Sequence, residues 1–598
     1  MSCFYRRDLH IALFCANLVT TLACTASGPN AKGSTSGGAG SSFDAAGTAS
    51  GGSSVVSGGG NGVIAGGGSA GTGAGAGGIA ESPTNPTLLG DVQFSTPSQT
   101  FRNSLEVGLS TSIAGAEIRY TTNGQLPAVT SSLYSGSPLS ITATTELRAQ
   151  AFVAGAVAGQ PSTGLYVART FDASSDLPIL VVDGYGGGKP ADKEVYLRAA
   201  FMLFEPSGGV ASLSGLPTVA TRSGYHVRGQ SSARFPQSPY RLELWDNADQ
   251  DADYALLGMP ADSDWALIPP YYDRSLVRNP LVYELGRELG LQAPRLRFAE
   301  VYLNYEGRAL SEADYQGIYW FSETIKNANV RTNLKQLRED TTTLPQISGG
   351  YIFKFDQAAA EEPILECTGS EPISGGFGGP MGGNGTCWVD LEVVDPELPN
   401  AEQEAWLTAH IQAFHDSLHQ TPIGDYTAYI DVPSFVDYLI INELTRNVDA
   451  YVRSAFYFKD RDGKVKAGPL WDYNFSLAVG GAGTINPTGG FQFAGTRNVN
   501  NWYPKLVTDP MFMAQVRARW LALRQGPLSE AALDERVTAL AAPLANAVVR
   551  DYAKWPVGDV FEPNGFVRGP TVATWEGQLG ALRTFLRARA TWMDSELQ

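Results

Sequence analysis

Residues 442–476 read NELTRNVDAYVRSAFYFKDRDGKVKAGPLWDYNFS. Apolar and polar residues alternate on both sides of Asp462-Gly463, and this period of two around a turn pair predicts a β-hairpin. Two acids, Asp449 and Asp472, lie just beyond the open end of that hairpin. Neighbouring strands lie about 4.8 Å apart and residues rise about 3.3 Å each, so the two carboxylates could approach within roughly 10 Å. The hairpin therefore predicts a cation site at its open end.

The residues beside these two acids offer further oxygen ligands. Asn474 lies two residues after Asp472, and in an extended backbone both side chains would point the same way. Asn447 precedes Asp449 in a polar loop that follows a predicted helix. Hard oxygen ligands suit Mg²⁺, whereas the five histidines show no zinc-binding spacing. The alternative is an Asx-rich strand exit, whose short polar side chains bond only the local backbone.

A second polar cluster lies upstream in RGQSSARFPQSPYRLELWD, residues 228–246. Arg228, Ser231 and Ser232 follow a predicted strand, and Arg241 lies on the next one. Main-chain amides of a small polar turn and a bidentate guanidinium together can cradle an anion such as phosphate. The alternative for both arginines is a structural ion pair.

Length and charge limit the class of protein. The 598 residues predict about three or four folding units at ordinary domain sizes. The formal net charge of −17 argues against a nucleic-acid partner, because a phosphate-binding face needs a basic surplus. Residues 177–598 open with strand patterns and close with the amphipathic helical stretches 509–526 and 577–597. We therefore expect an α+β domain of two lobes over 177–598.

The N-terminus has the pattern of an export signal. Two arginines precede the apolar residues 11–23, which are too few to cross a bilayer as a stable helix. The letters TLAC, ending at Cys24, resemble a bacterial lipobox, so residues 1–24 are expected to be a lipoprotein-type signal with lipid on Cys24. Residues 25–85 are mostly Gly, Ser, Ala and Thr, and predict a disordered tether. We expect a cell-envelope protein that contacts the outer membrane or cell surface only through this anchor.

The cysteines agree with export. Once the signal is removed and Cys24 carries lipid, one pair remains, Cys367 and Cys387, on either side of a glycine-rich loop. A cross-link would constrain a loop that cannot bury a core of its own, so we expect a disulfide. The alternative is a pair of free thiols in a reducing compartment.

The segment 86–172 shows period-two alternation with Asn123-Gly124 at a turn, which predicts a small antiparallel β-sandwich. The run IRYTTNG from Ile118, followed by ITATTELRAQA from Ile141, resembles the C-terminal domain of chitobiases and β-hexosaminidases. The resemblance implies an immunoglobulin-like accessory module without catalytic groups. Contact with a polysaccharide through this module is a further expectation.

Six motifs in order resemble the spore coat protein H, or CotH kinase-like, family. They are RGQSSARFPQSPYRLEL at 228, LLGMPADSDWALIPPYYDRSLVRNPLVYELGRELG at 256, GIYWFSETIKNANVR at 317, SGGYIFKFD at 348, NELTRNVDAYVRSAFYFKD at 442 and GPLWDYNFS at 468. The family implies an atypical protein-kinase-like fold that uses ATP with Mg²⁺ or Mn²⁺ to phosphorylate Ser or Thr of envelope proteins.

The resemblance also implies a role for each matching residue. Asp449 would be the catalytic acid-base residue, and Asp472 would bind the metal with help from Asn474 and Asn447. The anion-binding turn, with Arg228, Ser231, Ser232 and Arg241, would contact nucleotide phosphates. Glu323 would order this cluster or the nucleotide. Trp265 is expected in the core, and Asp273 and Arg274 are expected to form a structural pair.

Two departures from the family pattern favour a second interpretation. Gln237 and Ser238 replace a lysine pair that would lie near the phosphates, unless Arg241 or Lys354 compensates. Asn474 stands where a second acid is common. The alternative function is therefore a weak or inactive CotH-like surface adhesin or scaffold, for which glycans are a candidate ligand.

Overall fold

The computed structural model of the chain describes residues 85–356, 363–368, 387–481, 485–495, 499–561 and 567–598. The predicted export signal, Cys24 and the tether up to residue 84 lie outside these residues. No helix within the described ranges is long and apolar enough to cross a membrane. The described residues all belong to one compact unit, Ala80–Gln598.

The first domain is built of short strands. They are β1 (Val92–Phe94), β2 (Gln99–Phe101), β3 (Leu105–Val107), β4 (Leu109–Thr111), β5 (Glu117–Thr121), β6 (Ser132–Leu133), β7 (Leu139–Ile141), β8 (Thr145–Val153) and β9 (Ala156–Ala168). One sheet has the order β2-β9-β8-β5-β6, and β1 pairs with β4 and β3 with β7. The β2–β9 pairing is parallel, so the expectation of a wholly antiparallel domain is wrong. The two-residue hairpin turn is Ala154-Gly155, while Asn123-Gly124 begins a longer loop.

A closed barrel follows in the chain. Its strands are β11 (Ile179–Asp183), β12 (Leu197–Phe204), β14 (Val219–Val227), β15 (Tyr240–Trp245), β16 (Asp264–Ile268), β18 (Tyr315–Glu323) and β17 (Leu296–Asn304), given in the order of their pairing. A small pair, β10 (Ser174–Ser175) and β13 (Ala211–Ser212), lies outside it. The parallel pairing of β11 with β17 closes the barrel. Buried apolar side chains fill the interior, and Trp265 is among them, as expected.

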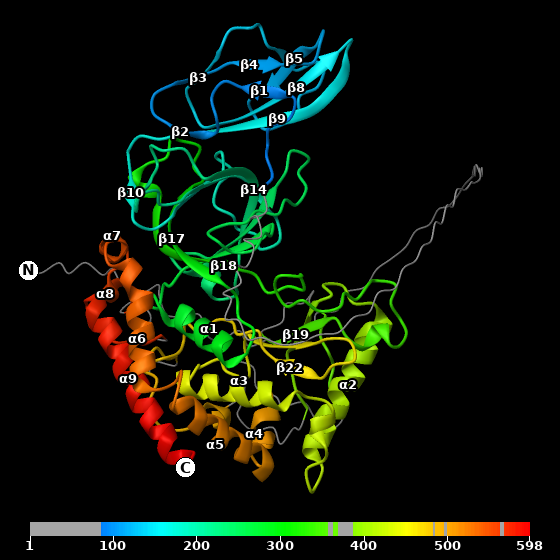
Figure 1. Cartoon of the computed structure of the whole chain (residues 1–598), viewed down its shortest axis with the longest axis vertical. Helices are drawn as coiled ribbons and strands as arrows, with labels where there is room; N and C mark the ends of the chain where they lie inside the picture. Colours follow the sequence, from blue (N-terminus) through cyan, green and yellow to red (C-terminus); the bar gives the residue numbers. More distant parts are fainter. Residues whose placement is uncertain (1–84, 357–362, 369–386, 482–484, 496–498, 562–566) are drawn as a thin grey trace, which may run out of the picture. The chain divides into compact units, whose positions relative to one another are not determined.

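The rest of the domain combines a sheet with helices. The sheet has the order β20 (Leu391–Asp395), β19 (Tyr351–Phe355), β21 (Ala455–Lys459) and β22 (Val465–Ala467). The helices are α1 (Arg278–Leu289), α2 (Ala401–His419), α3 (Val432–Thr445), α4 (Trp502–Leu506), α5 (Pro510–Arg524), α6 (Glu530–Ala541), α7 (Ala547–Lys554), α8 (Val557–Phe561) and α9 (Trp575–Glu596). The long helix α3 is buried on almost all sides and packs on α1, α5 and α9 (Figure 1).

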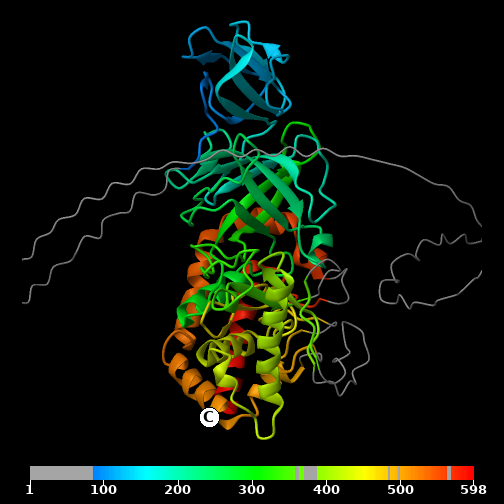
Figure 2. The same cartoon turned by 90° about the vertical axis from the view of Figure 1, so that its right-hand side faces the viewer.

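The predicted hairpin is present as β21 and β22. Lys459 lies opposite Val465, so the loop between them is centred on Asp462, as the sequence predicts. The helices predicted over 509–526 and 577–597 are α5 and α9. The expected order of strands first and helices afterwards is wrong in detail, since α1 lies between β16 and β17 and the second sheet alternates with α2 and α3. The later helix α7 packs on barrel strand β18, where the N–H of Ile318 donates to Asp551, and the turned view shows orange helices beside the green strands (Figure 2).

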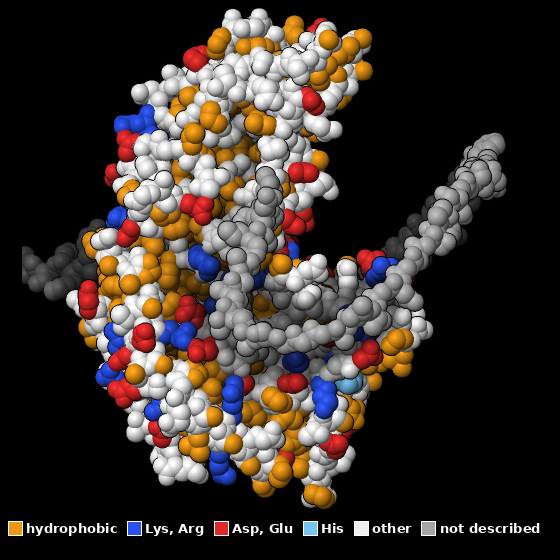
Figure 3. Space-filling view, in the orientation of Figure 1, with side chains coloured by type: hydrophobic (Ala, Val, Ile, Leu, Met, Phe, Trp, Pro, Cys, Tyr) orange, Lys and Arg blue, Asp and Glu red, His pale blue; other side chains and the backbone are white. Residues whose placement is uncertain are grey.

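Charged side chains are mixed on the face seen in the space-filling view. Lysine and arginine side chains lie among aspartate and glutamate side chains, and they do not gather into one basic area on this face (Figure 3). The mixture is consistent with a chain whose acidic residues outnumber its basic ones.

Candidate functional site

Three acids lie at one end of the strands of the second sheet, and this end is called the sheet edge below. Asp356 follows β19 directly, Asp449 precedes β21 by a few residues, and Asp472 comes after the end of β22. Strand β21 is antiparallel to both of its neighbours. The end of β19, the start of β21 and the end of β22 therefore meet at the same edge. The pairing pattern thus brings the two predicted acids together and adds a third.

The loop that carries Asp449 is fixed by local hydrogen bonds. Helix α3 ends where Arg446 takes a left-handed φ of 48°. Asn447 is buried, and its side-chain oxygen accepts a hydrogen bond from the N–H of Asp449 at 3.2 Å. The N–H of Val448 donates to the carbonyl of Phe475 at 2.9 Å. The loop is therefore tied to the segment that follows the WDYN stretch.

Asp472 lies in a loop rather than in a strand. Its φ is 58°, a left-handed conformation that Asp tolerates better than most residues, so the expected extended backbone from Asp472 to Asn474 is wrong. Helix α1 holds the loop: the N–H of Asp472 donates to Tyr283 Oη at 3.2 Å and that of Tyr473 to Asn279 Oδ1 at 2.7 Å. The N–H of Asn474 bonds the Asp472 carboxylate, as the Asx alternative predicts. Asn474 Oδ1 is buried without a hydrogen-bond partner among the described residues.

The three acids act on one another electrostatically. Asp472 is exposed as a residue, yet the protein packed around its carboxylate desolvates that group. This desolvation, with the negative charges of Asp449 and Asp356, raises the pKa of Asp472 to about 7, while Arg228 acts to lower it. Near neutral pH this carboxyl is therefore balanced between its two protonation states. A cation placed here would favour the ionised form.

Arg228 provides positive charge next to these acids. It follows β14, and its guanidinium lies 4.9 Å from the centre of the Trp471 ring. Desolvation and the charge of Arg241 lower the pKa of Arg228 to about 10, whereas Asp472 and Asp356 act to raise it. The guanidinium makes no hydrogen bond or ion pair with the described residues, so its donors are available to a phosphate group. A phosphate contact by Arg228 stays a prediction.

The other residues of the predicted anion-binding turn differ in whether their side chains are already paired within the protein. Ser231 is exposed, and Ser232 begins a 3₁₀ turn, Ser232–Arg234, so both hydroxyls are accessible to a ligand. Arg241 forms an ion pair with Asp264 at 2.8 Å, and Asp264 also lies 2.6 Å from Lys326. The structural-pair alternative thus describes the contacts of Arg241 better than a phosphate clamp does.

The two positions that depart from the family pattern are both buried. Gln237 Nε2 donates to two main-chain carbonyls of the β18 region, each at 3.1 Å, and Ser238 Oγ donates to a neighbouring carbonyl at 2.9 Å. Lys354, which was a possible substitute cation, lies 3.1 Å from Asp356 and 2.5 Å from Glu392. Its charge is therefore already offset by two acids.

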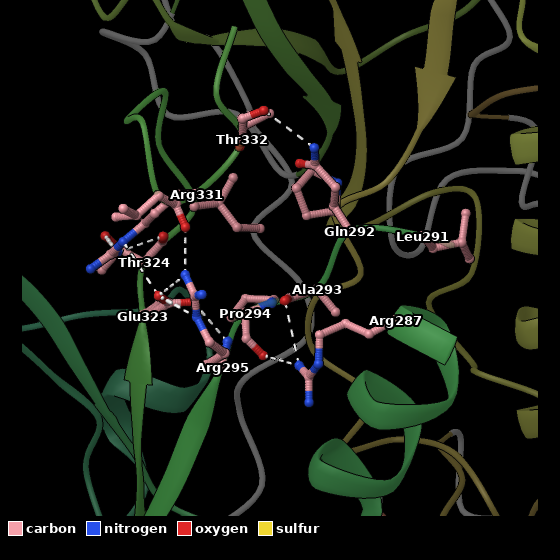
Figure 4. A pocket seen from close by; sticks show the side chains of 13 residues that line it. Arg287, Leu291, Gln292, Ala293, Pro294, Arg295, Glu323, Thr324, Arg331 and Thr332 are labelled. Atoms are coloured by element: carbon pink, nitrogen blue, oxygen red, sulfur yellow. Dashed lines mark hydrogen bonds and ion pairs between the residues drawn. The ribbon is translucent and has the colours of Figure 1, made fainter. Parts of the chain in front are cut away.

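Glu323, at the end of β18, makes its main contacts with Arg295. Its carboxylate accepts the Arg295 main-chain N–H at 2.8 Å and Nε at 2.9 Å. It lines a pocket together with several arginines (Figure 4). The charges that most affect Asp472 and Arg228 do not include Glu323. A role for Glu323 toward the nucleotide stays a prediction.

The donor set at the sheet edge fits Mg²⁺ shared with a nucleotide. Within the described residues, no three His, Cys, Asp or Glu side chains are arranged to hold a metal ion by themselves. Mg²⁺ in phosphoryl-transfer sites is commonly held by one or two carboxylates plus substrate phosphates, so a closed cluster is not required. Asp472 and the unpartnered Asn474 Oδ1 could supply protein ligands, with Asp449 nearby. Asn447 already accepts one hydrogen bond through its oxygen.

Sequence reasoning missed Asp356, although a signal was present. The residue ends the SGGYIFKFD motif, directly after an apolar strand. What could not be read was the pairing of β19 with β21, because about a hundred residues separate them in the chain. In the structure Phe355 lies opposite Ala455, which brings Asp356 beside Ser454.

Two smaller predictions concern pairs. Cys367 and Cys387 lie against each other with Cα atoms 5.5 Å apart, which suits a disulfide; their oxidation state stays a prediction. Asp273 and Arg274 are both buried and structural, but not as a pair. Asp273 pairs with Arg278, and Arg274 pairs with Asp551 at 2.6 Å.

Two family models match the chain, in the order that the sequence motifs predict. Residues 96–163 match the chitobiase/β-hexosaminidase C-terminal domain, and residues 225–593 match the CotH kinase protein. No curated protein gives a significant match to the chain. The second model covers well over half of the residues, including all the acids and arginines discussed above. The chain belongs to the CotH kinase protein family.

Proposed function

We propose that this protein is a kinase that transfers the γ-phosphoryl group of ATP, with Mg²⁺ or Mn²⁺, to Ser or Thr hydroxyls of envelope or surface proteins. One observation carries the proposal: desolvation and the nearby charges of Asp449 and Asp356 raise the pKa of Asp472, next to an arginine whose guanidinium donors are unused among the described residues. A group of aspartates beside an arginine suits a site that binds a metal–phosphate complex, because the carboxylates bind the metal and the guanidinium binds the phosphate.

Each residue has a distinct part in this reaction. Asp449 accepts the proton of the acceptor Ser or Thr hydroxyl. The oxygen of that hydroxyl forms a bond to the γ-phosphorus. The bond between that phosphorus and the β–γ bridging oxygen breaks, and ADP leaves with the electron pair. Arg228 hydrogen-bonds the phosphate oxygens, whose charge it offsets. A divalent cation, held by ionised Asp472 and the Asn474 oxygen, would neutralise phosphate charge.

A second candidate is a CotH-like adhesin or scaffold with little or no activity, which could contact glycans through its first domain. The positions of Gln237 and Ser238 favour it, because both side chains are uncharged, buried and bonded to carbonyls, although Lys189 Nζ lies 3.1 Å from Ser238 Oγ. Arg241 and Lys354 are engaged with acids, so neither is free to replace the missing lysines. In this second candidate function the protein has the same fold but transfers phosphoryl groups slowly or not at all.

Transfer of radiolabelled phosphate from [γ-³²P]ATP separates the two candidates. The full chain should label itself or a generic protein acceptor, and Asp449→Asn and Asp472→Asn should each reduce the rate roughly 10²–10⁴-fold. Asp462→Asn is the matched control, since Asp462 also has φ 58° but lies in the hairpin loop away from the sheet edge. No labelling, together with no stabilisation of the fold by ATP and metal, would favour the scaffold.

We also propose that the protein is exported and anchored by lipid on Cys24. The support is the signal-like N-terminus and the paired Cys367 and Cys387. Labelling of cells with a fatty-acid analogue should mark the wild-type chain and leave Cys24→Ser unmarked. Equal labelling of both chains would contradict the anchor.

A further inference from the structure

A pocket of about 240 Å³ lies where α1 ends, β17 begins and β18 ends. Arg287 comes from the last turn of α1, Arg295 from the start of β17, and Arg331 from the chain beyond β18. Figure 4 shows these side chains with Glu323 around the opening. At about 30 Å³ for each water molecule, the volume corresponds to roughly eight waters. The pocket can therefore hold a small molecule.

Each of the three arginines donates to a main-chain carbonyl, and two of them also pair with acids: Arg295 lies 2.6 Å from Glu323 and Arg331 lies 3.1 Å from Asp262. Arg287 Nη1 donates to the carbonyl of Pro294 at 2.6 Å. Arg295 Nη2 donates to that of Val330 at 2.5 Å, and Arg331 donates to that of Thr324 at 2.7 Å. Carbonyl oxygens fix the direction of a guanidinium without cancelling its charge. The arginines are thus oriented in advance, and Arg287 makes no ion pair within the described part of the chain.

Carboxylates offset this charge only in part. Among the lining residues Glu323 is the one acid, 2.6 Å from Arg295 and 4.0 Å from Arg331, and the charge of Glu284, outside the lining, acts on Arg287. Asp262, outside the lining, lies 3.1 Å from Arg331 but is shared with Lys326 at 2.7 Å. A positive pocket in a chain of net charge −17 is not explained by the general composition. Arg287 Nε and Nη2 and Arg295 Nη1 make no hydrogen bond within the described part of the chain.

We propose that this pocket binds a small molecule carrying phosphate or carboxylate groups. Planar guanidinium groups with spare donors match the geometry of such oxyanions. The apolar side chains of Leu291, Ile325 and Val330 complete the wall and suit the carbon part of a metabolite. Asp449, Asp472 and Arg228 do not line this pocket, so the inference does not depend on phosphoryl transfer by them, although Glu323, with its predicted role toward the nucleotide, does line it.

The bound oxyanion would also contact the segment that leads to Asp472. Pro469 lines the pocket, and the N–H of Leu470 donates to the carbonyl of Gln292, another lining residue, at 2.8 Å. Ligand binding would stabilise this pairing and with it the entry to the Asp472 loop. The pocket is therefore placed to influence the order of the neighbouring site.

Isothermal titration of the full chain with pyrophosphate and with citrate, without metal and at low salt, tests the proposal. Wild-type protein should bind at least one of them, and Arg287→Gln or Arg295→Gln should weaken binding about tenfold or more, since a charge-assisted hydrogen bond is lost. Arg297→Gln is the matched control: Arg297 is exposed, also bonds main-chain carbonyls and does not line the pocket. It should bind as the wild type does.

Arg228→Gln distinguishes the pocket from the acid cluster. The proposal expects this variant to bind the probe normally, and it is overturned if Arg228→Gln loses binding while Arg287→Gln keeps it. Absence of binding by the wild type, or equal binding by the pocket variants, also overturns it. If Arg287→Gln lowers the melting temperature, Arg287→Lys, which keeps the charge, should restore most of the binding.

Discussion

Asp472 has a left-handed backbone conformation, which costs conformational energy in a residue other than glycine. Its carboxylate is also desolvated and lies near two other acids, and both of these disfavour its ionised form. Such features persist when the surrounding structure enforces them, here through Tyr283 of α1 and the ties between the two loops. Strain of this kind is typical of functional sites. It also makes the residue sensitive to pH.

The first prediction is a pH profile. Ionised Asp472 is needed to hold a cation, and its pKa is about 7 in the unliganded protein. The ratio kcat/KM, which reports ionisations of the free enzyme, should therefore rise between pH 6 and 8 with a midpoint near 7. Asp356→Asn removes a charge that raises this pKa, so its midpoint should move to lower pH. A flat profile in both proteins over that range would contradict the assignment.

The second prediction concerns stability without ligand. Because the folded-state pKa of Asp472 is raised, folded protein binds this proton more tightly than unfolded protein, and stability falls as pH rises from about 4 to about 7. Asp472→Asn should thus melt at the wild-type temperature near pH 4 and at a higher temperature above pH 7. Thermal melts at pH 4, 6 and 8 check this. Asp462→Asn should show no such trend, since Asp462 is remote from the acids.

At the scale of elements, α9 and α3 are joined by a buried ion pair beneath the loop of Asp449. Arg589 of α9 lies 3.1 Å from Glu443 of α3, and neither side chain is exposed. Burial raises the pKa of Glu443, while main-chain N–H groups of Gln492 and Phe493 and the charge of Arg589 act to lower it. Tyr451 Oη also donates to Glu443, at 2.9 Å. The C-terminal helix therefore helps to hold the end of α3 and the loop of Asp449 that follows it.

The third prediction follows from that pair. Arg589→Met leaves Glu443 buried without its cation and should lower the free energy of unfolding by about 3–5 kcal/mol. Arg587→Met on the same helix is the control, because its ion pairs are exposed and should contribute about 0–1 kcal/mol. Urea denaturation of both variants measures the difference. Similar losses in the two would mean that the pair does not support the fold.

The sequence predicted elements whose cause is local and missed those whose cause is distant. The hairpin centred on Asp462 was predicted because alternation and a turn pair act within about twenty residues. Closure of the barrel could not be predicted, since it rests on a parallel pairing of Ile179 with Glu300. The place of Asp356 was hidden for the same reason. Asp449 and Asp472 were found because one hairpin brings them together.

At the scale of the whole molecule, the first domain and the barrel share buried contacts. Glu146 of β8 lies 2.6 Å from Arg222 of β14, and both are buried. Leu88, Leu165 and Val167 belong to the same apolar cluster as residues of β11 and β12. The sequence suggested two modules in series, because family resemblance and periodicity carry no information on contacts between domains. The structure joins them through a common core.

The fourth prediction is that these two domains unfold together. Glu146→Ala removes a buried carboxylate that pairs with Arg222 and Arg198, and Arg222 then keeps Asp249 and the carbonyl of Asp246, so the free energy of unfolding should fall by about 1–3 kcal/mol. Because the core is shared, calorimetry of the full chain should show one main transition that moves to lower temperature as a whole. Glu117→Ala, at an exposed pair with Arg119, should leave it unchanged. The opposite result would be a separate early transition in the wild type that alone moves in Glu146→Ala. In that case the first domain would be an independent module that is only tethered to the kinase-like domain.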